Sequence, residues 1–336
     1  MSKGHRVLTG ITTTGVPHLG NLVGAVLPAI KASKLKDTTS FLFLADYHSL
    51  IKNSDLELRH KSSFEIAACW LACGLDPKKA IFYRQSDIPH IFELAWVLSC
   101  LASKGLLNRA HAYKAATSDN ETKKVQDIDK GINMGLFNYP ILMAADILMF
   151  KADSVPVGQD QKQHIEMTRD IALKFNNQYG DILTLPDAII DKNAGVLPGI
   201  DGRKMSKSYG NTIPIFSENE ALRKVIMKIK TNSLEPGEPK EASDSNIFNI
   251  YKAISTKEKI DELHNLFQEG IAWGEAKKVL FEELNSFLKP FKNEYEKIIK
   301  DKSYIERILI EGSEKALSIS EPIIKEVRQA VGIKGF

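Results

Sequence analysis

The chain has 336 residues, of which 43% are hydrophobic and 26% charged, with a formal net charge of +3. This composition is typical of a folded globular protein and argues against a disordered or collagen-like chain. No stretch approaches the roughly 18 consecutive apolar residues of a membrane span, and the opening MSKGHRVLTG lacks the apolar core of a signal peptide. We therefore expect a cytoplasmic protein without a membrane partner.

The basic excess lies in the first part of the chain. Residues 1–215 carry 25 Lys and Arg against 21 Asp and Glu, whereas residues 216–336 carry 20 against 21. Any RNA contact by the second part must therefore come from local basic patches.

Strand and helix patterns alternate in the first part of the chain. Apolar runs that predict strands occupy residues 5–10, 41–46 and 81–87, and helical patterns occupy residues 21–33 and 61–75. Such alternation predicts an α/β fold around a parallel sheet.

Two further helices are expected after a polar interruption. Residues 116–130, ATSDNETKKVQDIDK, lack apolar periodicity and predict an exposed, mobile loop. Pro140 is expected to open the next helix, because proline is tolerated in the first turn. Another helix is predicted from about Gly158, with one apolar face made of Ile165, Thr168, Ile171 and Phe175.

The strand patterns stop near Ser217, and the sequence after it has helical periodicity throughout. We expect a first domain over residues 1–216 with an insertion at about 105–140. A helical domain is expected over 217–312, and a last helix within 313–336 is expected to pack back on the first domain.

Neither cysteines nor histidines predict a metal site. Cys69, Cys73 and Cys100 lie in apolar segments with a helical pattern and lack paired CxxC spacing. We therefore interpret them as reduced core thiols. Asp160 and His164 have helical spacing that suits a metal but lack a third convincing ligand.

A first candidate phosphate loop is TGITTTGVPHLGN, residues 9–21. Gly10, Gly15 and Gly20 allow sharp turns and close approach to a ligand, and a helix start offers N–H groups to phosphate. His18 adds a side-chain donor. Taken alone, the loop is equally consistent with a tight turn.

A second candidate is GRKMSKSYGN, residues 202–211. Lys204 and Lys207 beside Ser206 and Ser208 suit the neutralisation of a triphosphate during displacement, and Gly199, Gly202 and Gly210 can act as flexible points. A solvated basic loop is the alternative for this segment alone. Two such loops about 180 residues apart are a more specific indication of a triphosphate site than either loop alone.

HLGN and KMSKS resemble the two signatures of the class I aminoacyl-tRNA synthetases. HLGN departs from the usual HIGH at Asn21, so no role for a second histidine carries over. YPILMAADILMF (139–150) and VPVGQDQKQHIEMTRDIALKFN (155–176) resemble the tryptophanyl branch closely, and the resemblance continues through ADYHSLI, RQSDIP and NRAHAYKA. It covers most of residues 7–215 and implies a Rossmann-like catalytic domain followed by a helical anticodon-binding domain.

The pocket residues agree with an indole ligand. Met143 and Asp146 are three apart and share a helix face, which places a carboxylate in apolar surroundings where it needs a partner. An indole N–H could be that partner, with the ring enclosed by Leu8, Val155, Val157 and Met143. The alternative is that Asp146 pairs with a donor of the protein itself.

The resemblance implies roles for further residues. Tyr139 and Gln161 would hold the amino group of tryptophan, His48 would line its pocket, and Gly158 and Asp160 would shape the site where substrate and adenylate meet. The residues implied to contact ATP are Thr12, Thr13, Thr14, Gly20, Asn21, Met205, Ser206 and Ser208, with His18, Lys204 and Lys207 as catalytic residues. Lys114 is a candidate for the lysine that grips pyrophosphate in some members.

The implied enzyme activates L-tryptophan with ATP, accompanied by Mg²⁺, and transfers it to tRNA(Trp). The resemblance also implies a homodimer, for which INMGLFNYPIL (132–142) is the candidate face. Three alternatives remain at this point. A tyrosyl-tRNA synthetase should carry a tyrosine on the first strand, where Leu8 stands; a small-molecule adenylyltransferase would lack the full KMSKS; and an RNA-binding module without catalysis would have a damaged ATP loop.

Overall fold

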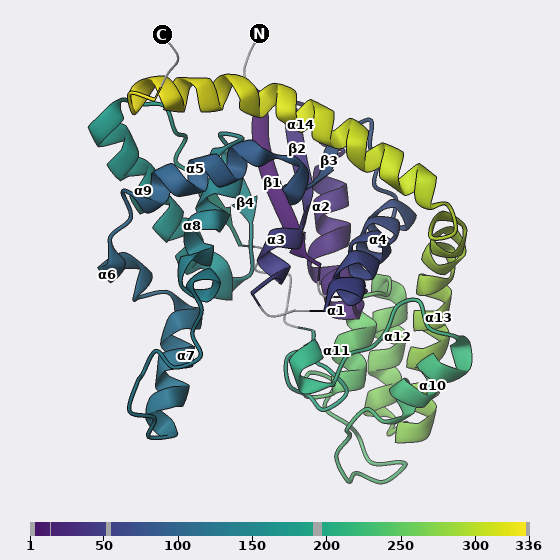
Figure 1. Cartoon of the computed structure of the whole chain (residues 1–336). Coiled ribbons are helices and arrows are strands. Elements are labelled where there is room, and N and C mark those ends of the chain that lie inside the picture. Colours follow the sequence, from purple (N-terminus) through teal and green to yellow (C-terminus); the bar gives the residue numbers. More distant parts are fainter. Residues whose placement is uncertain (1–3, 14, 52–54, 191–196, 334–336) are drawn as a thin grey trace.

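The computed structural model describes residues 4–13, 15–51, 55–190 and 197–333, without the side chain of Asp160. Thr14 therefore lies outside the described residues. At the centre is a sheet of five parallel strands in the order β3-β2-β1-β4-β5 (Figure 1). The strands are β1 His5–Thr12, β2 Thr38–Ala45, β3 Ala80–Arg84, β4 Ser154–Pro156 and β5 Asp187–Ile189. The α/β class predicted from the alternating patterns is confirmed.

The order of the strands reverses at β1. The chain passes from β1 to β2 on one side, and β4 pairs with the other side of β1 through Val7 and Ser154. In an open parallel sheet, ligands bind beyond the carboxyl ends of the strands at such a reversal. The loop after Thr12 starts at this point.

Helices cover both faces of the sheet in the first part of the chain. They are α1 Leu19–Asn21, α2 Leu27–Ala32, α3 Asp46–Ser49, α4 Leu56–Ala72, α5 Pro89–Ser99, α6 Lys104–Leu107, α7 His111–Thr122, α8 Met134–Leu148 and α9 Lys162–Tyr179. A π-helical turn, Leu22–Val26, joins α1 to α2, and 3-10 turns span Gln85–Asp87, Gln159–Gln161 and Lys207–Tyr209.

Side-chain alternation along β2 divides the core between the two faces. Phe41 and Phe43 belong to a cluster with residues of α5, α8 and α9, whereas Leu42 and Leu44 belong to a cluster with α4 and the later helices. This is the period of two expected of a strand that is buried on both sides.

The later part of the described chain is helical, as predicted. Its helices are α10 Asn219–Met227, α11 Asn246–Lys252, α12 Lys257–Gln268, α13 Trp273–Ile298 and α14 Lys302–Ala330. The last helix therefore begins at Lys302, well before the expected position near 313, so the proposed boundary falls inside α14. None of the described helices is both long and apolar enough to cross a membrane.

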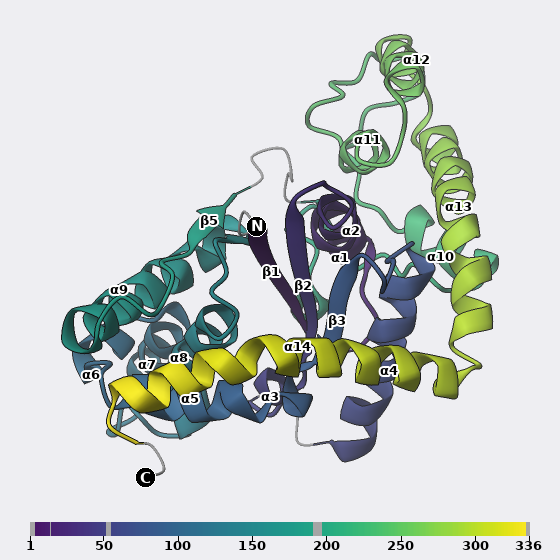
Figure 2. The same ribbon diagram turned by 90° about the horizontal axis from the view of Figure 1, so that it is seen from above.

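Helix α14 spans the first part of the molecule. It runs across the whole domain in Figure 1 (yellow), and Figure 2 shows the same helix from above. At Gly312 a Cβ atom would lie 1.7 Å from the backbone oxygen of Phe82 in β3, so only glycine permits this approach. Helix α14 thus covers β3, one of the two edge strands of the sheet, which protects this strand from pairing with other chains.

The polar segment 116–130 is not a loop throughout, contrary to the prediction. Helix α7 continues to Thr122. Lys123 pairs with Asp119 at 2.6 Å, and the Thr122 hydroxyl donates to the Ser118 carbonyl at 2.8 Å. Pairs four residues apart can support a helix that has few apolar contacts.

Pro140 does not open its helix, contrary to the prediction. Helix α8 begins at Met134, and the Asn133 side chain caps it by accepting from the Leu136 amide at 2.8 Å. Pro140 lies inside the helix. The prediction for the cysteines also needs correction, because Cys69 and Cys73 are buried but Cys100 is exposed.

Candidate active site

The structure brings the two glycine-containing loops together beyond the carboxyl end of β1. The Leu19 amide donates to the Ile213 carbonyl at 3.0 Å, and His18 forms an isolated antiparallel bridge with Pro214. The Gly20 amide donates to the Met205 sulfur at 3.3 Å. Segments almost 200 residues apart in the sequence therefore form one site.

His18 is held as a neutral donor. Its Nδ1 accepts from the Asn21 amide at 3.3 Å, and the Asn21 side chain accepts from the His18 amide at 3.2 Å. Burial, with a smaller contribution from Lys207, lowers the pKa of His18 to about 4. Because Nδ1 is an acceptor, the single proton of the neutral ring lies on Nε2, which can donate to a ligand.

Glycine is required at positions 20 and 15 for two different structural reasons. A Cβ at Gly20 would lie 3.1 Å from the His18 ring, so a side chain would crowd the imidazole. Gly15 has φ +95°, a conformation that side chains rarely adopt. Its carbonyl accepts from Lys207 Nζ at 2.8 Å, which places the ammonium group of the second loop over the first.

The second loop is organised by Asn211, a residue that the sequence did not identify. The Asn211 side chain is buried, accepts from the Ser206 amide at 2.8 Å and donates to Asp201 at 2.7 Å and to the Lys204 carbonyl at 3.1 Å. The loop carrying Lys204 and Lys207 is thus folded around one amide. Hydrogen bonding to Asn211 and Arg203 lowers the pKa of Asp201 to about 2.

The remaining polar side chains of the second loop lie at or near the surface. Lys204, Lys207 and Ser208 are exposed, and the hydroxyls of Ser206 and Ser208 lie 2.7 Å apart. Met205 is buried against the first loop. Although Lys207 is exposed as a whole, partial desolvation of its ammonium group, which lies against the first loop, lowers its pKa. An ammonium group near phosphate stays protonated because the anion favours its charged form.

Asp146 is the buried carboxylate of the predicted tryptophan pocket. It is 1% exposed. Its Oδ1 accepts from Gln85 Nε2 at 2.8 Å, and its Oδ2 lies 2.8 Å from His48 Nε2. Burial raises the pKa of Asp146, against the opposing effect of His48 and Gln85. The alternative in which Asp146 pairs with donors of the protein itself is therefore observed, with His48 and Gln85 as the partners. Each oxygen keeps a further lone pair for a ligand donor.

The apolar residues predicted around Asp146 lie in one cluster. Leu8 and Val155 are buried in it, and Met143 and Val157 pack against it with partial exposure. These side chains come from β1, β4, α8 and the segment after β4. They can present an apolar surface beside the carboxylate.

Tyr139 has a partner that the sequence did not predict. Its hydroxyl lies 2.6 Å from His164 Nε2, and burial raises the pKa of Tyr139 to about 12. Gln161 ends the 3-10 turn that leads into α9, and Gly158 precedes that turn. Thr12 is the last residue of β1, and Thr13 is buried beside it.

Comparison with known proteins identifies the family. Residues 2–289 match the family model described as tRNA synthetases class I (W and Y). A tryptophan–tRNA ligase of Neisseria meningitidis is 53% identical over 334 residues, which is 99% of each chain. The chain belongs to the tryptophanyl branch of the class I aminoacyl-tRNA synthetases.

Other members of this branch extend the similarity. The tryptophan–tRNA ligase of Pseudomonas aeruginosa is 52% identical over 98% of this chain and 74% of its own length. A crystal structure of tryptophanyl-tRNA synthetase from Campylobacter jejuni with ADP and tryptophan has a TM-score of 0.87 at 39% identity, covering 97% of this chain and 99% of that chain. A tyrosyl-tRNA synthetase from Aeropyrum pernix aligns with a TM-score of 0.67 at 17% identity, which shows the shared fold alone.

The candidate site contains three residues whose contacts the sequence did not predict: Gln85, His164 and Asn211. Gln85 and His164 lie within segments that resemble the family, but a lone polar side chain in such a segment does not reveal its partner. Asn211 is the last residue of the second loop, but the motif alone does not show that its side chain binds the backbone of the same loop. No described group of three or more His, Cys, Asp or Glu side chains is arranged to hold a metal ion.

Proposed function

We propose that the chain is a tryptophan–tRNA ligase that makes tryptophanyl-adenylate from L-tryptophan and ATP and then charges tRNA(Trp). The observation that carries this proposal is the buried Asp146 carboxylate, bound by Gln85 and His48 and flanked by apolar side chains. The phosphate-type loops that meet through His18 and Met205 supply the site for ATP.

In the first step, a carboxylate oxygen of tryptophan attacks the α-phosphorus of ATP. The bond to the bridging oxygen breaks, and pyrophosphate leaves with the electron pair. His18 Nε2 and the ammonium groups of Lys204 and Lys207 stabilise the charge that develops on phosphate oxygens. Magnesium enters as MgATP, since Mg²⁺ usually binds through phosphate oxygens and water.

In the second step, a terminal ribose hydroxyl of tRNA(Trp) attacks the carbonyl carbon of the adenylate, and AMP leaves. Neither step requires a covalent intermediate with the protein. Catalysis comes from alignment of the reactants and from charge stabilisation. Thr12, Thr13, Thr14, Gly20 and Asn21 are the proposed nucleotide contacts of the first loop.

The amino acid is recognised at both ends. The indole N–H donates to Asp146, and the ring lies against Leu8, Met143, Val155 and Val157. A site that binds a substrate donor with a buried polar group rejects analogues lacking it by roughly 10⁴- to 10⁵-fold. Tyr139 and Gln161 are proposed to bind the α-amino group, with Gly158 and Asp160 next to the adenylate.

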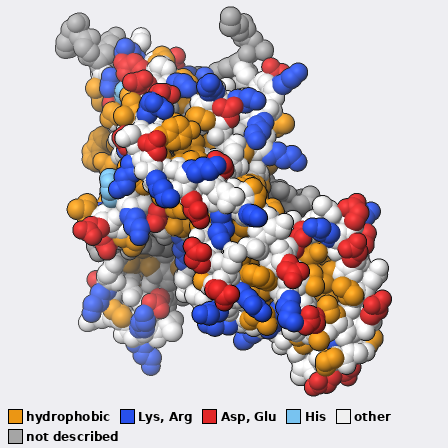
Figure 3. All heavy atoms as spheres, turned by 90° about the vertical axis from the view of Figure 1, so that its right-hand side faces the viewer, with side chains coloured by type: hydrophobic (Ala, Val, Ile, Leu, Met, Phe, Trp, Pro, Cys, Tyr) orange, Lys and Arg blue, Asp and Glu red, His pale blue; other side chains and the backbone are white. Residues whose placement is uncertain are grey.

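The tRNA is expected to contact the helical part of the chain. On the face shown in Figure 3, basic and acidic side chains are interspersed rather than separated by sign. Contacts to the anticodon therefore depend on local groups, as the even charge balance of residues 216–336 predicts. Lys114, on helix α7, remains the proposed contact to pyrophosphate.

We expect a cytoplasmic homodimer. Trp96 on α5 is 73% exposed, and Met134 at the start of α8 is 66% exposed. Helices α5 and α8 pack against each other, and Met134 lies in the predicted face 132–142. Large exposed apolar side chains on adjoining helices are typical of a protein interface.

The test is amino-acid-dependent exchange of labelled pyrophosphate into ATP, measured with each of the twenty amino acids. The proposal predicts exchange with tryptophan far above that with every other amino acid. Exchange with tyrosine instead would keep the chemistry but transfer the specificity to the tyrosyl branch. Exchange with none would refute the synthetase function.

A further inference from the structure

The turn that carries Gln85 is not part of the sheet. The ladder between β2 and β3 ends with Leu44 opposite Arg84, and the next residues form the 3-10 turn Gln85–Asp87. Gln85 is 0% exposed and binds at both ends of its amide, since Nε2 donates to Asp146 at 2.8 Å and Oε1 accepts from the Tyr47 amide at 3.2 Å. The position of this turn therefore determines the geometry of the donor to Asp146.

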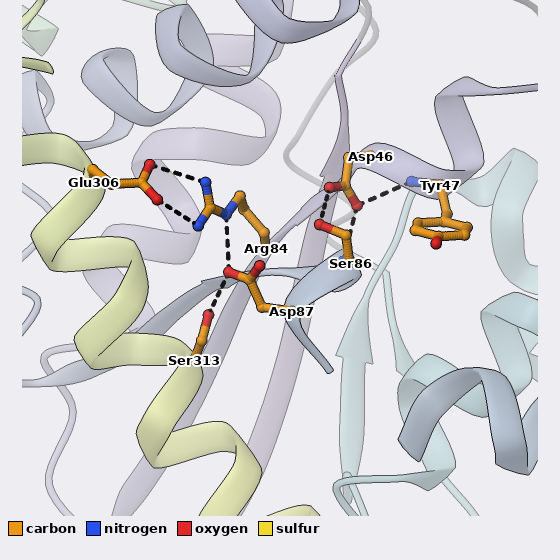
Figure 4. A network of polar contacts seen from close by, with 7 residues as sticks. All are labelled: Asp46, Tyr47, Arg84, Ser86, Asp87, Glu306 and Ser313. Atoms are coloured by element: carbon orange, nitrogen blue, oxygen red, sulfur yellow. Dashed lines mark hydrogen bonds and ion pairs between the residues drawn. The ribbon is translucent and has the colours of Figure 1, made fainter. Parts of the chain in front are cut away.

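Helix α14 is bound to Arg84, the residue before the turn, and to Asp87, its last residue (Figure 4). Arg84 forms two hydrogen bonds with the Glu306 carboxylate, at 2.9 and 2.8 Å. Arg84 Nε donates to Asp87 at 2.9 Å, and the Ser313 hydroxyl donates to the same Asp87 oxygen at 2.8 Å. Paired contacts between a guanidinium and a carboxylate fix direction as well as distance.

The other side of the turn faces helix α3. Ser86 donates to Asp46 through both its amide and its hydroxyl (Figure 4). Helix α3 also carries His48, the second partner of Asp146. The turn thus connects α14 on one side to the protein groups that bind the Asp146 carboxylate on the other.

Packing does not hold the turn from every direction. A cavity of about 380 Å³ lies beside it, lined in part by Asp46, Arg84, Ser86 and Asp87. This open space leaves the turn with fewer packing contacts on this side than a filled core would provide. Polar contacts to α14 and α3 therefore contribute to its positional restraint.

We propose that Arg84 and Glu306 are positioning residues for tryptophan recognition, which hold Gln85 in the geometry that Asp146 needs to accept the indole N–H. This inference rests on the proposed function. It assigns α14 a role beyond covering the sheet edge: the helix sets the affinity and selectivity of the amino-acid pocket without touching the substrate.

The test uses Glu306→Gln, which keeps the size of the side chain but removes its charge. In pyrophosphate exchange, the KM for tryptophan is expected to rise about 2- to 30-fold, the usual range for residues that act through a network. The KM for ATP and kcat should stay within about twofold of the wild type. The preference for tryptophan over its benzothienyl analogue, which lacks the indole N–H, should fall.

The matched control is Arg328→Gln. Arg328 also joins α14 to the first part of the chain by a paired contact, at 2.6 and 2.6 Å to Glu93 on α5, but among the described residues no hydrogen bond or ion pair joins it to the turn at Gln85–Asp87. Its loss should leave the KM for tryptophan and the analogue preference unchanged. Thermal unfolding of both variants would show whether they lose comparable stability.

Two results would overturn the inference: an unchanged KM and analogue preference in Glu306→Gln, or equal changes in Glu306→Gln and Arg328→Gln. If Glu306→Gln does not fold, Ser313→Ala removes only the contact to Asp87 and is judged by the same criteria. Absence of tryptophan-dependent exchange in the wild type would instead refute the proposed function, so the two failures are distinguishable.

Discussion

Replacing Asp146 by asparagine tests the indole-binding site with almost no change in volume. Asparagine offers one oxygen and one NH₂ group, whereas Asp146 accepts at both oxygens. In the variant, an NH₂ group must face one of the donors that converge on this position. One charge-assisted hydrogen bond is lost, which costs about 1.5–3 kcal/mol and corresponds to about a 10- to 150-fold loss of kcat/KM.

The loss should appear mainly in the KM for tryptophan. The indole N–H lies far from the reacting carboxylate, so its contact has similar strength before and during the reaction, and removal of such a contact leaves kcat nearly unchanged. The assay is pyrophosphate exchange at varied tryptophan and fixed saturating ATP, for the wild type and Asp146→Asn. The KM for ATP in the same preparations serves as the control.

The benzothienyl analogue of tryptophan completes this test. The wild type should discriminate strongly against it, because the analogue lacks the donor, and the variant should discriminate much less. This comparison isolates the pairwise contact in the manner of a double-mutant cycle. Equal discrimination in both proteins, or a KM for ATP that rises with that for tryptophan, would refute the assignment of Asp146.

Further perturbations test the phosphate loops and the dimer. Lys207→Ala should lower kcat of exchange about 10²- to 10³-fold with little change in the KM for tryptophan; an unchanged kcat would remove Lys207 from the mechanism. Because the folded-state pKa of His18 is lowered from 6.5 to about 4, the unfolded chain binds the proton more readily, so the free energy of unfolding should fall as pH drops from about 6.5 to about 4. In urea titrations this fall should be smaller for His18→Asn, and equal falls in both proteins would contradict the burial of a neutral His18. Trp96→Glu should convert a dimer into a folded monomer in analytical ultracentrifugation, and an unchanged mass would place the interface elsewhere.

The parts of the fold that the sequence predicted are those with local signals. The strands β1, β2 and β3 coincide with apolar runs, and both phosphate-type loops are short contiguous motifs. Strands β4 and β5 have three residues each, too few to show a period. The sequence predicts the start of α8 at Pro140, but the helix begins earlier, because Asn133 caps it and Pro140 is accommodated inside it.

The missed site residues act through contacts that are distant in sequence. Gln85 meets Asp146 across 61 positions, and no periodicity or local motif relates them. Asn211 is near its partners in sequence, but its role depends on how the backbone from Asp201 to Ser206 folds around one amide. Such partners become visible only when the chain is folded.

The most direct test of the proposed function is the charging of RNA. Purified protein is incubated with ATP, labelled tryptophan and a tRNA(Trp) transcript, with tyrosine and tRNA(Tyr) as the parallel reaction. We predict acid-precipitable label on tRNA(Trp), formed with one AMP per tryptophan attached, and none on tRNA(Tyr). Charging of tRNA(Tyr) with tyrosine, or failure to label tRNA(Trp) in a protein that binds ATP, would contradict the account.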